Sequence, residues 1–391
     1  MRKVTVLFEG DINRRLGVFN AVVNRVKHLR EIADADVVVR MMQVYDGRIV
    51  SLLRGSKRVK ERPATIEAEG ITIDVCWIKR HWLDSLMHKL FHRRPKMLMR
   101  KLQRLSWELR GASVVLAHDR MAAYVGEMGA KELGIPCFVT WHGASIYTDP
   151  VNDEMIREVT IELLQGATCN WFVSRGLVDK AQELTTQMKW DVLLNGASPA
   201  FYRLDDDTRE QLRRSHGVMD GQHVVAYVGR FEPVKNVTML PELFQAIQRR
   251  SGQGIAFWTI GDGVQHSEVV TAMKAAGINC HHWGAQPPES MPQWMNCIDL
   301  LVLPSSLEGL PLVVIEALQC GAHVVASDVV GTAEAIGKEN AFALDEHFID
   351  NVSERAAQML RGEVTQSLPA QVSWAATARK EWSIIAPYVN G

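Results

Sequence analysis

Short apolar runs rich in valine, isoleucine and leucine alternate with segments of helical period along almost the whole chain. The runs are continuous rather than alternately apolar and polar, which is typical of strands buried on both faces of a parallel sheet. Strands that alternate with helices in this way indicate βαβ units, so we expect an α/β fold. The predicted strands span residues 3–8, 37–44, 71–78, 113–117, 137–141, 168–173, 191–194, 223–228, 255–260, 280–283, 300–303, 323–326 and 342–344.

The pattern restarts near residue 220, after a less regular stretch that begins with Asn195-Gly196 and contains Ser198-Pro199. Asn-Gly and Ser-Pro pairs are typical of turns and linkers. We therefore predict two Rossmann-like domains whose parallel sheets face each other across a cleft. The predicted domains are an N-terminal domain of residues 1–198 and a C-terminal domain of residues 199–373, with a final helix, residues 374–391, that packs back onto the first.

The composition is that of an ordinary globular protein, with 47% hydrophobic and 23% charged residues. The six cysteines show no Cys-x-x-Cys spacing, so buried reduced thiols are expected. A strand begins within three residues of the N-terminus, and we see no apolar core of a signal peptide. No apolar run approaches the roughly 18 residues of a membrane span. We expect a cytoplasmic protein, or one lying peripherally on the inner face of the membrane.

One segment, from Pro304 to Asp328, is especially informative about chemistry. A predicted strand leads into a polar loop with Glu308, and Gly309-Leu310-Pro311 then opens a helix, with proline suited to its first turn. Glu316 lies in that helix, eight residues after Glu308. Free N–H groups and the helix dipole favour a phosphate at this edge of the sheet. The carboxylates beside it suit sugar hydroxyls, so the segment predicts a sugar-nucleotide site.

Two cations follow the first strand of the second half, in the loop Gly229-Arg230 to Lys235-Asn236, before a helix expected near Val237. The planar fork of arginine and the mobile charge of lysine together suit a diphosphate. Taken alone, the pair is better explained as two solvated loop cations. Its position at the same sheet edge as Glu308 favours the diphosphate.

Glycine-containing turns end the next two strands, at Gly261-Asp262-Gly263 and at Trp283-Gly284-Ala285. Glycine allows the backbone to approach a ligand closely, and backbone groups after Trp283 could bind the edge of a nucleobase. Each turn is weak evidence by itself. Their position at successive strand ends adds weight to a donor-binding interpretation.

The combined motifs, Arg-x4-Lys, Gly-Asp-Gly and Glu-Gly-x-Pro-x4-Glu, resemble the donor domain of GT-B glycosyltransferases, specifically the retaining family 4 (group 1 glycosyl transferases). The resemblance covers residues 221–345 well and the first half more loosely. It implies that the C-terminal domain, residues 199–373, binds the nucleotide-sugar donor and that the N-terminal domain, residues 1–198, is the acceptor-side domain. It implies that Arg230 and Lys235 neutralise the donor diphosphate and that the Gly309 and Leu310 amides contact a phosphate. It also implies that Glu308 binds hydroxyls of the transferred sugar and Glu316 those of the ribose.

The first half resembles the same family at Thr140-Trp141-His142-Gly143, which implies that His142 faces the cleft and contacts the donor sugar. A lone histidine at a strand end is otherwise more often a structural residue. Many members of the family have Asp where Ser145 stands here, so a carboxylate role is not transferred. The first loop lacks the usual Gly-Gly pair, and Gly17 is the candidate for the closest approach to the phosphates.

The predicted chemistry is cleavage of a sugar–phosphate bond, which leaves growing negative charge on the diphosphate. Arg230, Lys235 and a helix N-terminus can stabilise that charge. The chain contains no Asp-x-Asp motif and no histidine cluster with metal-ligand spacing, so we expect no metal and no other cofactor. The family resemblance implies retention of the anomeric configuration.

The positive charge is concentrated in the first half, since residues 1–200 contain 30 Lys and Arg against 23 Asp and Glu, whereas residues 201–391 contain 14 against 22. The segment Lys79–Arg104 alone has nine Lys and Arg and one acidic residue, interspersed with apolar side chains such as Trp82. It is suited to an anionic membrane surface. The solvated face of ordinary amphipathic helices is nearly as good an explanation, whereas nucleic-acid binding lacks an accompanying motif.

Together these features predict a glycosyltransferase that moves a sugar from a nucleotide donor, UDP- or GDP-linked, to a glycan or lipid-linked acceptor in cell-surface polysaccharide or glycolipid synthesis. A nucleotide-sugar hydrolase, epimerase or phosphorylase of the same fold is an alternative. So is a catalytically silent nucleotide-sugar-binding partner, although the presence of both glutamates, both cations and His142 argues against it. The sequence does not name the sugar, the linkage or the acceptor.

Overall fold

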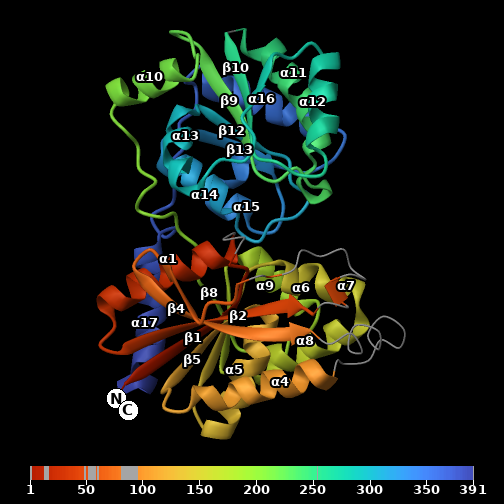
Figure 1. Ribbon diagram of the computed structural model, residues 1–391. Coiled ribbons are helices and arrows are strands. Elements are labelled where there is room, and N and C mark those ends of the chain that lie inside the picture. The colour runs from red at the N-terminus through yellow and green to blue at the C-terminus, as the bar shows by residue number, and fades with distance from the viewer. Residues whose placement is uncertain are drawn as a thin grey trace. The chain divides into compact units, whose positions relative to one another are not determined.

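A computed structural model describes residues 2–12, 17–47, 50–51, 59, 61–80, 96–252 and 254–390. The chain divides into two compact units, one of Met1–Asn195 with Trp374–Gly391 and the other of Gly196–Ser373. Both are α/β structures built on largely parallel sheets, which confirms the predicted fold class (Figure 1). The second unit begins at Gly196, close to the predicted boundary, and the returning C-terminal helix belongs to the first unit.

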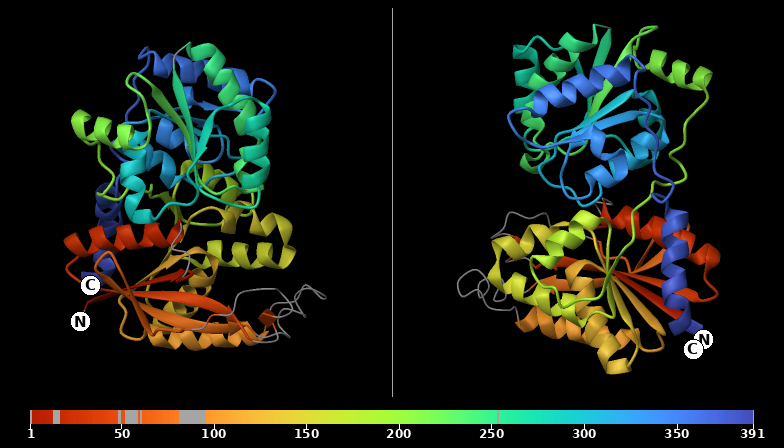
Figure 2. Two further views of the ribbon diagram at one scale, coloured as in Figure 1. Left: turned by 45° about the horizontal axis from the view of Figure 1, so that its top comes forward. Right: turned by 180° about the vertical axis from the view of Figure 1, so that it is seen from behind.

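Unit 1 contains a sheet of eight strands in the order β3-β4-β2-β1-β5-β6-β7-β8. Helices cover both of its faces (Figure 2). The strands are β1 (Lys3–Glu9), β2 (Asp36–Asp46), β3 (Thr65–Ala68), β4 (Ile71–Arg80), β5 (Val114–His118), β6 (Cys137–Trp141), β7 (Cys169–Phe172) and β8 (Trp190–Val192). The helices are α1 (Val18–Ile32), α4 (Lys96–Ser106), α5 (Asp119–Leu133), α6 (Ala144–Tyr147), α7 (Asp149–Asn152), α8 (Glu154–Gly166), α9 (Arg175–Gln182) and α17 (Trp374–Asn390).

One strand of unit 1 departs from the predicted pattern. β3 was not predicted, and it pairs with β4 in the antiparallel direction. The two strands are joined by the two-residue turn Glu69-Gly70, and both residues have positive φ angles, 51° and 76°. This is the backbone geometry that a tight hairpin requires. The short stretch Thr65–Ala68 lacks the continuous apolar run by which the other strands were found, because only Ala68 is buried.

The C-terminal helix α17 packs beside α1, at opposite ends of the chain (Figure 2). Ile385 and Val389 of α17 belong to the same hydrophobic core as Val22 and Val26 of α1. The core also contains Phe138 of β6, whose ring meets Tyr388 of α17 edge to face at 5.8 Å. The first unit therefore needs the last residues of the chain to complete its core.

Unit 2 contains a sheet of six strands in the order β11-β10-β9-β12-β13-β14, and every pairing between them is parallel. The strands are β9 (His223–Val228), β10 (Ile255–Ile260), β11 (Cys280–His282), β12 (Leu300–Leu303), β13 (His323–Ser327) and β14 (Ala341–Phe342). The α-helices are α10 (Asp206–Ser215), α11 (Leu240–Ser251), α12 (His266–Ala275), α13 (Met291–Cys297), α14 (Leu312–Gln319), α15 (Thr332–Ile336) and α16 (Phe348–Leu360).

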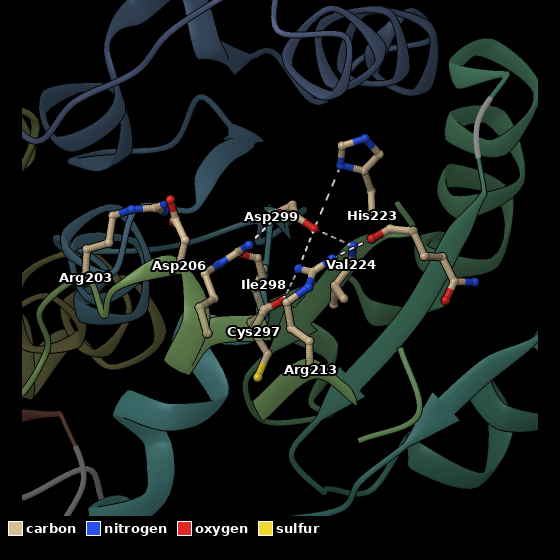
Figure 3. A network of polar contacts seen from close by, with 10 residues as sticks. Arg203, Asp206, Arg213, His223, Val224, Cys297, Ile298 and Asp299 are labelled. Carbon is tan, nitrogen blue, oxygen red and sulfur yellow. Dashed lines mark hydrogen bonds and ion pairs between the residues drawn. The ribbon is translucent and has the colours of Figure 1, made fainter. Parts of the chain in front are cut away.

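A charged network ties α10 to the amino ends of β9 and β12 (Figure 3). Asp299 accepts hydrogen bonds from Arg209 at 2.5 Å, from Arg213 at 2.8 Å and from the Val224 N–H at 2.7 Å. Burial by itself raises the pKa of Asp299, but the two guanidinium groups and the Val224 N–H outweigh it, so the pKa is lowered. The network fixes the edge of the sheet opposite to the one where the motif loops emerge.

None of the helices in the described part of the chain has both the length and the apolar character that crossing a bilayer requires.

Candidate active site

The predicted donor motifs of unit 2 all follow strands at one edge of its sheet. β9 lies between β10 and β12 and is parallel to both, so the loops after these three strands emerge side by side. Lys235 follows β9, Asp262 follows β10 and Glu308 follows β12. The carboxyl edge of a parallel sheet is where ligands bind in α/β proteins. The strand order therefore brings together motifs that are far apart in the sequence.

Lys235 and Glu308 form an ion pair at this edge, with 2.5 Å between Nζ and Oε1. Their side chains are only 18% and 11% exposed. The two loops are also joined through the backbone, because the N–H and the hydroxyl of Ser306 both donate to the Val234 carbonyl, at 2.9 and 3.0 Å. The predicted diphosphate cation and the predicted sugar-binding carboxylate are therefore direct neighbours.

Arg230 is placed differently from Lys235. Its side chain is 55% exposed and pairs with Glu232 at 2.6 Å. Its backbone carbonyl accepts a hydrogen bond from the buried Tyr227 hydroxyl at 2.7 Å, which holds the loop against β9. A 3-10 turn spans Pro233–Lys235, and a second spans Val237–Met239 before α11 begins at Leu240. The helix expected near Val237 thus begins as a 3-10 turn.

The glycines of two motif loops serve contacts between the loops themselves. A Cβ added to Gly261, whose φ is 134°, would lie 1.9 Å from the Gly229 carbonyl oxygen. A Cβ on Gly263 would lie 2.5 Å from the Phe231 carbonyl oxygen. Asp262 is exposed, and its side chain accepts the Gly263 N–H at 2.7 Å. The close backbone approach predicted for these glycines is therefore seen toward neighbouring loops.

The turn after β11 is also tied into the sheet edge. The Trp283 N–H donates to the Thr259 carbonyl at 2.9 Å, and the Gly284 carbonyl accepts the Gly261 N–H at 2.8 Å. Gln286 donates to the Trp283 carbonyl at 2.6 Å. Several of the backbone groups that could have bound a base thus hold the turn in place. Ala285, which follows in this turn, is exposed.

The indole of Trp283 belongs to an aromatic cluster that the sequence analysis did not identify. The cluster joins Trp283 to Trp258, Trp294 and His216, with ring centroids 5.5, 5.0 and 5.5 Å from that of Trp283. Trp258 lies in β10 and Trp294 in α13, whereas His216 directly follows α10, and no local spacing links them. Only the folded sheet brings them together.

The second glutamate of the motif lies in α14, as predicted. Pro311 precedes the helix as its N-cap residue, and the helix begins at Leu312, so the proline stands just before the first turn rather than in it. Gly309 and Leu310 are buried in the loop before it. Burial raises the pKa of Glu316 to about 7. Glu316 thus lies in a less polar environment than a surface carboxylate does. In that environment, a partner that donates hydrogen bonds stabilises the charge of Glu316.

In unit 1, His142 follows β6 and its backbone N–H donates to Asp119 at 3.1 Å. The Ser145 hydroxyl donates to the same carboxylate oxygen at 2.8 Å. Burial lowers the pKa of His142; nearby Asp119 opposes that effect and Arg25 adds to it. A carboxylate therefore does lie beside His142, although the sequence has Ser145 at the position where the resemblance led us to look for one. It comes from the end of the neighbouring strand, β5.

Gly17 precedes α1 and has a φ of 32°, with open space around the position of an added Cβ. Residues 13–16 of the same loop lie outside the described residues.

Comparison with protein families matches residues 208–381 to the group 1 glycosyl transferases. This range spans nearly all of unit 2. The match supports that family for unit 2. The match extends over the Arg-x4-Lys, Gly-Asp-Gly and Glu-Gly-x-Pro-x4-Glu motifs, so comparison and motifs support the same family.

Among curated proteins, this chain is 24% identical over 372 residues to a protein described as a teichuronic acid biosynthesis glycosyltransferase, TuaC of Bacillus subtilis, covering 93% of the chain and 87% of TuaC. It is 32% identical over 154 residues to the D-inositol 3-phosphate glycosyltransferase of Nocardia farcinica, covering 37% of the chain and 34% of that protein. The latter alignment spans about a third of its relative. Both relatives are described as glycosyltransferases, which supports glycosyltransferase activity for this chain.

Solved structures show the same fold. Anabaena Alr3699/HepE in complex with UDP-glucose superposes with a TM-score of 0.66 at 16% identity, covering 98% of the chain and 99% of HepE. WaaG, a glycosyltransferase involved in lipopolysaccharide biosynthesis, superposes with a TM-score of 0.62 at 15% identity, covering 97% and 95% of the two chains. The predicted GT-B architecture is thereby confirmed.

The predicted basic segment of this chain is described only in part, because residues 81–95 lie outside the described residues. α4 carries its C-terminal portion, with Arg100 and Arg104 exposed. Lys101 donates to the Lys79 carbonyl at 2.6 Å. Trp107, just beyond the helix, is 52% exposed. An indole therefore stands close in sequence to the exposed cations, which the sequence analysis did not note.

Two further observations concern metal binding and a cavity in the described part of the chain. No group of three or more His, Cys, Asp or Glu in this part of the chain is arranged to hold a metal ion. A cavity of about 590 Å³ lies in unit 1 against α5 and α8, and its lining includes none of the predicted site residues. Glu127 lines that cavity, and burial raises its pKa to about 8.

Proposed function

We propose that this protein transfers a sugar from a nucleotide-sugar donor to a glycan or lipid-linked acceptor in the synthesis of a cell-surface polysaccharide or glycolipid. The observation that carries the proposal is the Lys235–Glu308 pair at the carboxyl edge of the unit 2 sheet. A cation for a phosphate and a carboxylate for sugar hydroxyls stand side by side there, next to the loop that opens α14. A site for a phosphate alone has no need of the carboxylate.

We assign to each side chain the part of the donor whose charge or hydrogen-bonding groups it complements. Lys235 neutralises the diphosphate, and Arg230, whose side chain is exposed to solvent, adds a second positive charge. Glu308 accepts hydrogen bonds from hydroxyls of the transferred sugar, and the amides of Gly309 and Leu310 contact the phosphate. Glu316 accepts hydrogen bonds from the ribose. In unit 1, His142 contacts the transferred sugar and Gly17 approaches a phosphate.

The proposed donor is a UDP-sugar. HepE, whose fold this chain shares, was crystallised with UDP and with UDP-glucose. Backbone hydrogen bonds join the loops after β9, β10 and β11 to one another. These loops therefore offer a pre-formed surface, and a base and ribose can bind there without the entropic cost of ordering the loops. GDP- and ADP-sugars are the competing donors.

The proposed reaction breaks the bond between the anomeric carbon and the diphosphate oxygen, and the acceptor oxygen forms the new bond to that carbon with retention of configuration. The bonding electrons leave with the diphosphate, and Lys235 and Arg230 stabilise the charge that grows there. Because these cations supply positive charge that a divalent metal would otherwise provide, we propose that the chemical step needs none. The proton of the acceptor hydroxyl leaves with the departing phosphate oxygen.

We further propose that α4 and Trp107 hold the protein peripherally at an anionic membrane surface, where lipid-linked acceptors are found. Exposed Arg100 and Arg104 supply charge, and the indole supplies an interfacial anchor.

The decisive experiment incubates the purified protein with UDP-, GDP- and ADP-sugars, with and without membrane lipid extract, and follows release of nucleoside diphosphate. Release that depends on the extract, together with sugar in the lipid fraction, supports transfer. Release at the same rate without acceptor would instead indicate a hydrolase, and binding of UDP without any release would indicate a silent partner. The anomeric configuration of the product, read by proton NMR, tests retention.

A further inference from the structure

Two histidines stand at the ends of neighbouring strands of unit 1. His118 is the last residue of β5, and it pairs in register with Thr140 of β6, two residues before His142. Only 2% of the His118 surface is exposed. The sequence analysis assigned no role to this residue. Its position inside the edge from which His142 emerges makes it the nearest titratable neighbour of that ring.

The two rings are joined directly. His118 Nδ1 lies 3.0 Å from His142 Nε2, and the ring planes are inclined by 24°. A hydrogen bond between two neutral imidazoles holds one proton, so one nitrogen must donate and the other must accept. If His118 carries the proton on Nδ1, then His142 carries its own on Nδ1. If His142 donates from Nε2, its Nδ1 is an acceptor. The tautomer of one ring therefore sets the tautomer of the other.

Asp119 fixes the backbone from which the His142 ring projects. One carboxylate oxygen accepts both the His142 N–H, at 3.1 Å, and the Ser145 hydroxyl, at 2.8 Å. Asp119 itself has a φ of 62°, in the left-handed region that non-glycine residues seldom occupy. Such a conformation persists where surrounding contacts hold it, and it is concentrated at functional sites. The turn after β6 is thus held by the end of β5.

Burial, helped by the nearby Arg25, lowers the pKa of both rings. Arg25 of α1 donates to Thr140 at 3.1 Å and to Glu381 of α17 at 2.6 Å, and both members of that ion pair are buried. Burial lowers the pKa of His118 well below its ordinary value, and His142 and Arg25 lower it further. Burial likewise lowers the pKa of His142, with Asp119 opposing. Neither ring is protonated at neutral pH, so the hydrogen bond between them persists.

We propose that His118 and Asp119 are positioning residues for His142, His118 by setting its tautomer through the Nδ1–Nε2 hydrogen bond and Asp119 by holding its backbone turn. The consequence for turnover rests on the proposed function, in which His142 contacts the transferred sugar. A ring that presents one fixed nitrogen meets a sugar hydroxyl without first reorganising, which is what a reaction with a demanding geometry requires.

The structure offers matched substitutions at both positions. Asn at position 118 keeps a donor and an acceptor near the place of Nδ1, whereas His118→Leu removes both. Asn at position 119 can still accept from the His142 N–H and the Ser145 hydroxyl, whereas Asp119→Ala cannot. The exposed Lys180 of the same unit supplies a surface control, Lys180→Gln. His142→Gln identifies the His142 signals in spectra of protein labelled with nitrogen-15 in histidine.

The first measurement is the nitrogen-15 spectrum of the His142 ring from pH 5 to 9, which needs no substrate. In the wild-type protein, we expect one neutral tautomer throughout the neutral range. In His118→Leu, the ring should become a mixture of tautomers, and His118→Asn should restore a single one. Identical His142 spectra in the wild type and His118→Leu would overturn the proposal for His118.

The second measurement is turnover with the donor identified by the nucleotide-sugar screen. We expect kcat to fall by about tenfold to a hundredfold in His118→Leu and Asp119→Ala, with the Kd for UDP unchanged. The Asn variants should recover most of this loss. If His142→Gln has normal kcat, the assignment of His142 under the proposed function is wrong. The nitrogen-15 spectra then still test whether His118 sets the tautomer of His142. If His142→Gln is impaired but all four position-118 and position-119 variants are normal, the positioning proposal is wrong.

Discussion

Lys235 and Glu308 are 73 residues apart in the sequence, yet Lys235 Nζ lies 2.5 Å from Glu308 Oε1 in a largely buried pair. The pair has a consequence for donor binding. Each residue satisfies the charge of the other until a donor arrives, when the diphosphate competes with Glu308 for the lysine. The two residues should therefore affect nucleotide binding in opposite ways.

We predict that Lys235→Ala weakens the binding of UDP by about 1.5–3 kcal/mol, because it removes a charge-assisted contact. Glu308→Gln should leave UDP affinity unchanged or raise it, since it releases Lys235 from its partner. Glu308→Gln should also lower kcat, because the hydroxyls of the transferred sugar lose a carboxylate acceptor. Isothermal titration calorimetry with UDP, together with steady-state kinetics, measures both effects. Weaker UDP binding in Glu308→Gln would show that Glu308 contacts the nucleotide itself.

The raised pKa of Glu316, about 7, predicts a pH dependence of nucleotide binding. The ionised carboxylate is the better acceptor for two ribose hydroxyls, so UDP affinity should fall as the pH drops below about 7. The diphosphate itself also titrates, and Glu316→Gln shares that titration but not the titration of Glu316. The difference in Kd between the two proteins, measured from pH 5.5 to 8.5, therefore isolates this group. Parallel profiles would contradict a ribose contact.

The raised pKa of Glu316 also predicts how the stability of the folded protein changes with pH. A carboxyl group whose pKa is raised in the folded state destabilises that state once it ionises, so stability declines as the pH rises from about 4.5 toward 7. Glu316→Gln should remove this part of the decline. Thermal unfolding of the two proteins without nucleotide, across the same pH range, provides the check.

The network around Asp299 should affect stability without affecting the donor site (Figure 3). Asp299→Asn leaves the guanidinium groups of Arg209 and Arg213 without their charged partner, and we expect a loss of about 3 kcal/mol. The pKa of Asp299 is lowered in the folded state, so its stabilisation is present above about pH 4 and is lost as the pH falls through the folded value.

A control for this prediction lies in the same view. Arg203 and Asp206 form an exposed pair, 49% and 84% exposed, and Arg203→Gln should change stability by less than about 1 kcal/mol. Urea unfolding compares the two variants. A change in UDP affinity in Asp299→Asn would mean that the two edges of the sheet are coupled.

We expect turnover to survive chelation by EDTA. Lys235 and Arg230 already supply positive charge to the leaving diphosphate, so a divalent ion adds little to the chemical step. The comparison is the initial rate with EDTA, with Mg²⁺ and with Mn²⁺. Complete loss on chelation that either metal restores would disprove the proposed metal independence.

Membrane binding is testable on the described part of the basic segment. The combined variant Arg100→Gln, Arg104→Gln, Trp107→Ala should bind vesicles containing phosphatidylglycerol more weakly than the wild type, because each cation near the surface contributes about 1 kcal/mol. The binding should weaken at high salt, as screening shortens the reach of these charges. Two exposed arginines of unit 2, Arg214 and Arg361, replaced by Gln serve as the control. No sedimentation of the wild type with vesicles at low salt would leave α4 as a solvated helix face.

Local patterns were sufficient for the predictions that depend on neighbouring residues. Continuous apolar runs predicted strands such as Cys137–Trp141 and His223–Val228 with their observed bounds, because burial on both faces favours apolar side chains at successive positions. They missed Thr65–Ala68, whose strand depends on a two-residue hairpin turn. The motif around Glu308 and Glu316 predicted a loop followed by a helix, since its glycine and proline punctuate the chain.

The sequence by itself determined the α/β class, the division near residue 196 and the residue types of the donor motifs. Only the tertiary structure decided which of them meet. The position of β9 between β10 and β12 pairs Lys235 with Glu308 and makes Gly261 a neighbour of Gly229. Because β5 and β6 are neighbours, the carboxylate of Asp119 lies beside Ser145, which carries no charge of its own. Strand order depends on contacts summed over the whole sheet, and no local spacing encodes it.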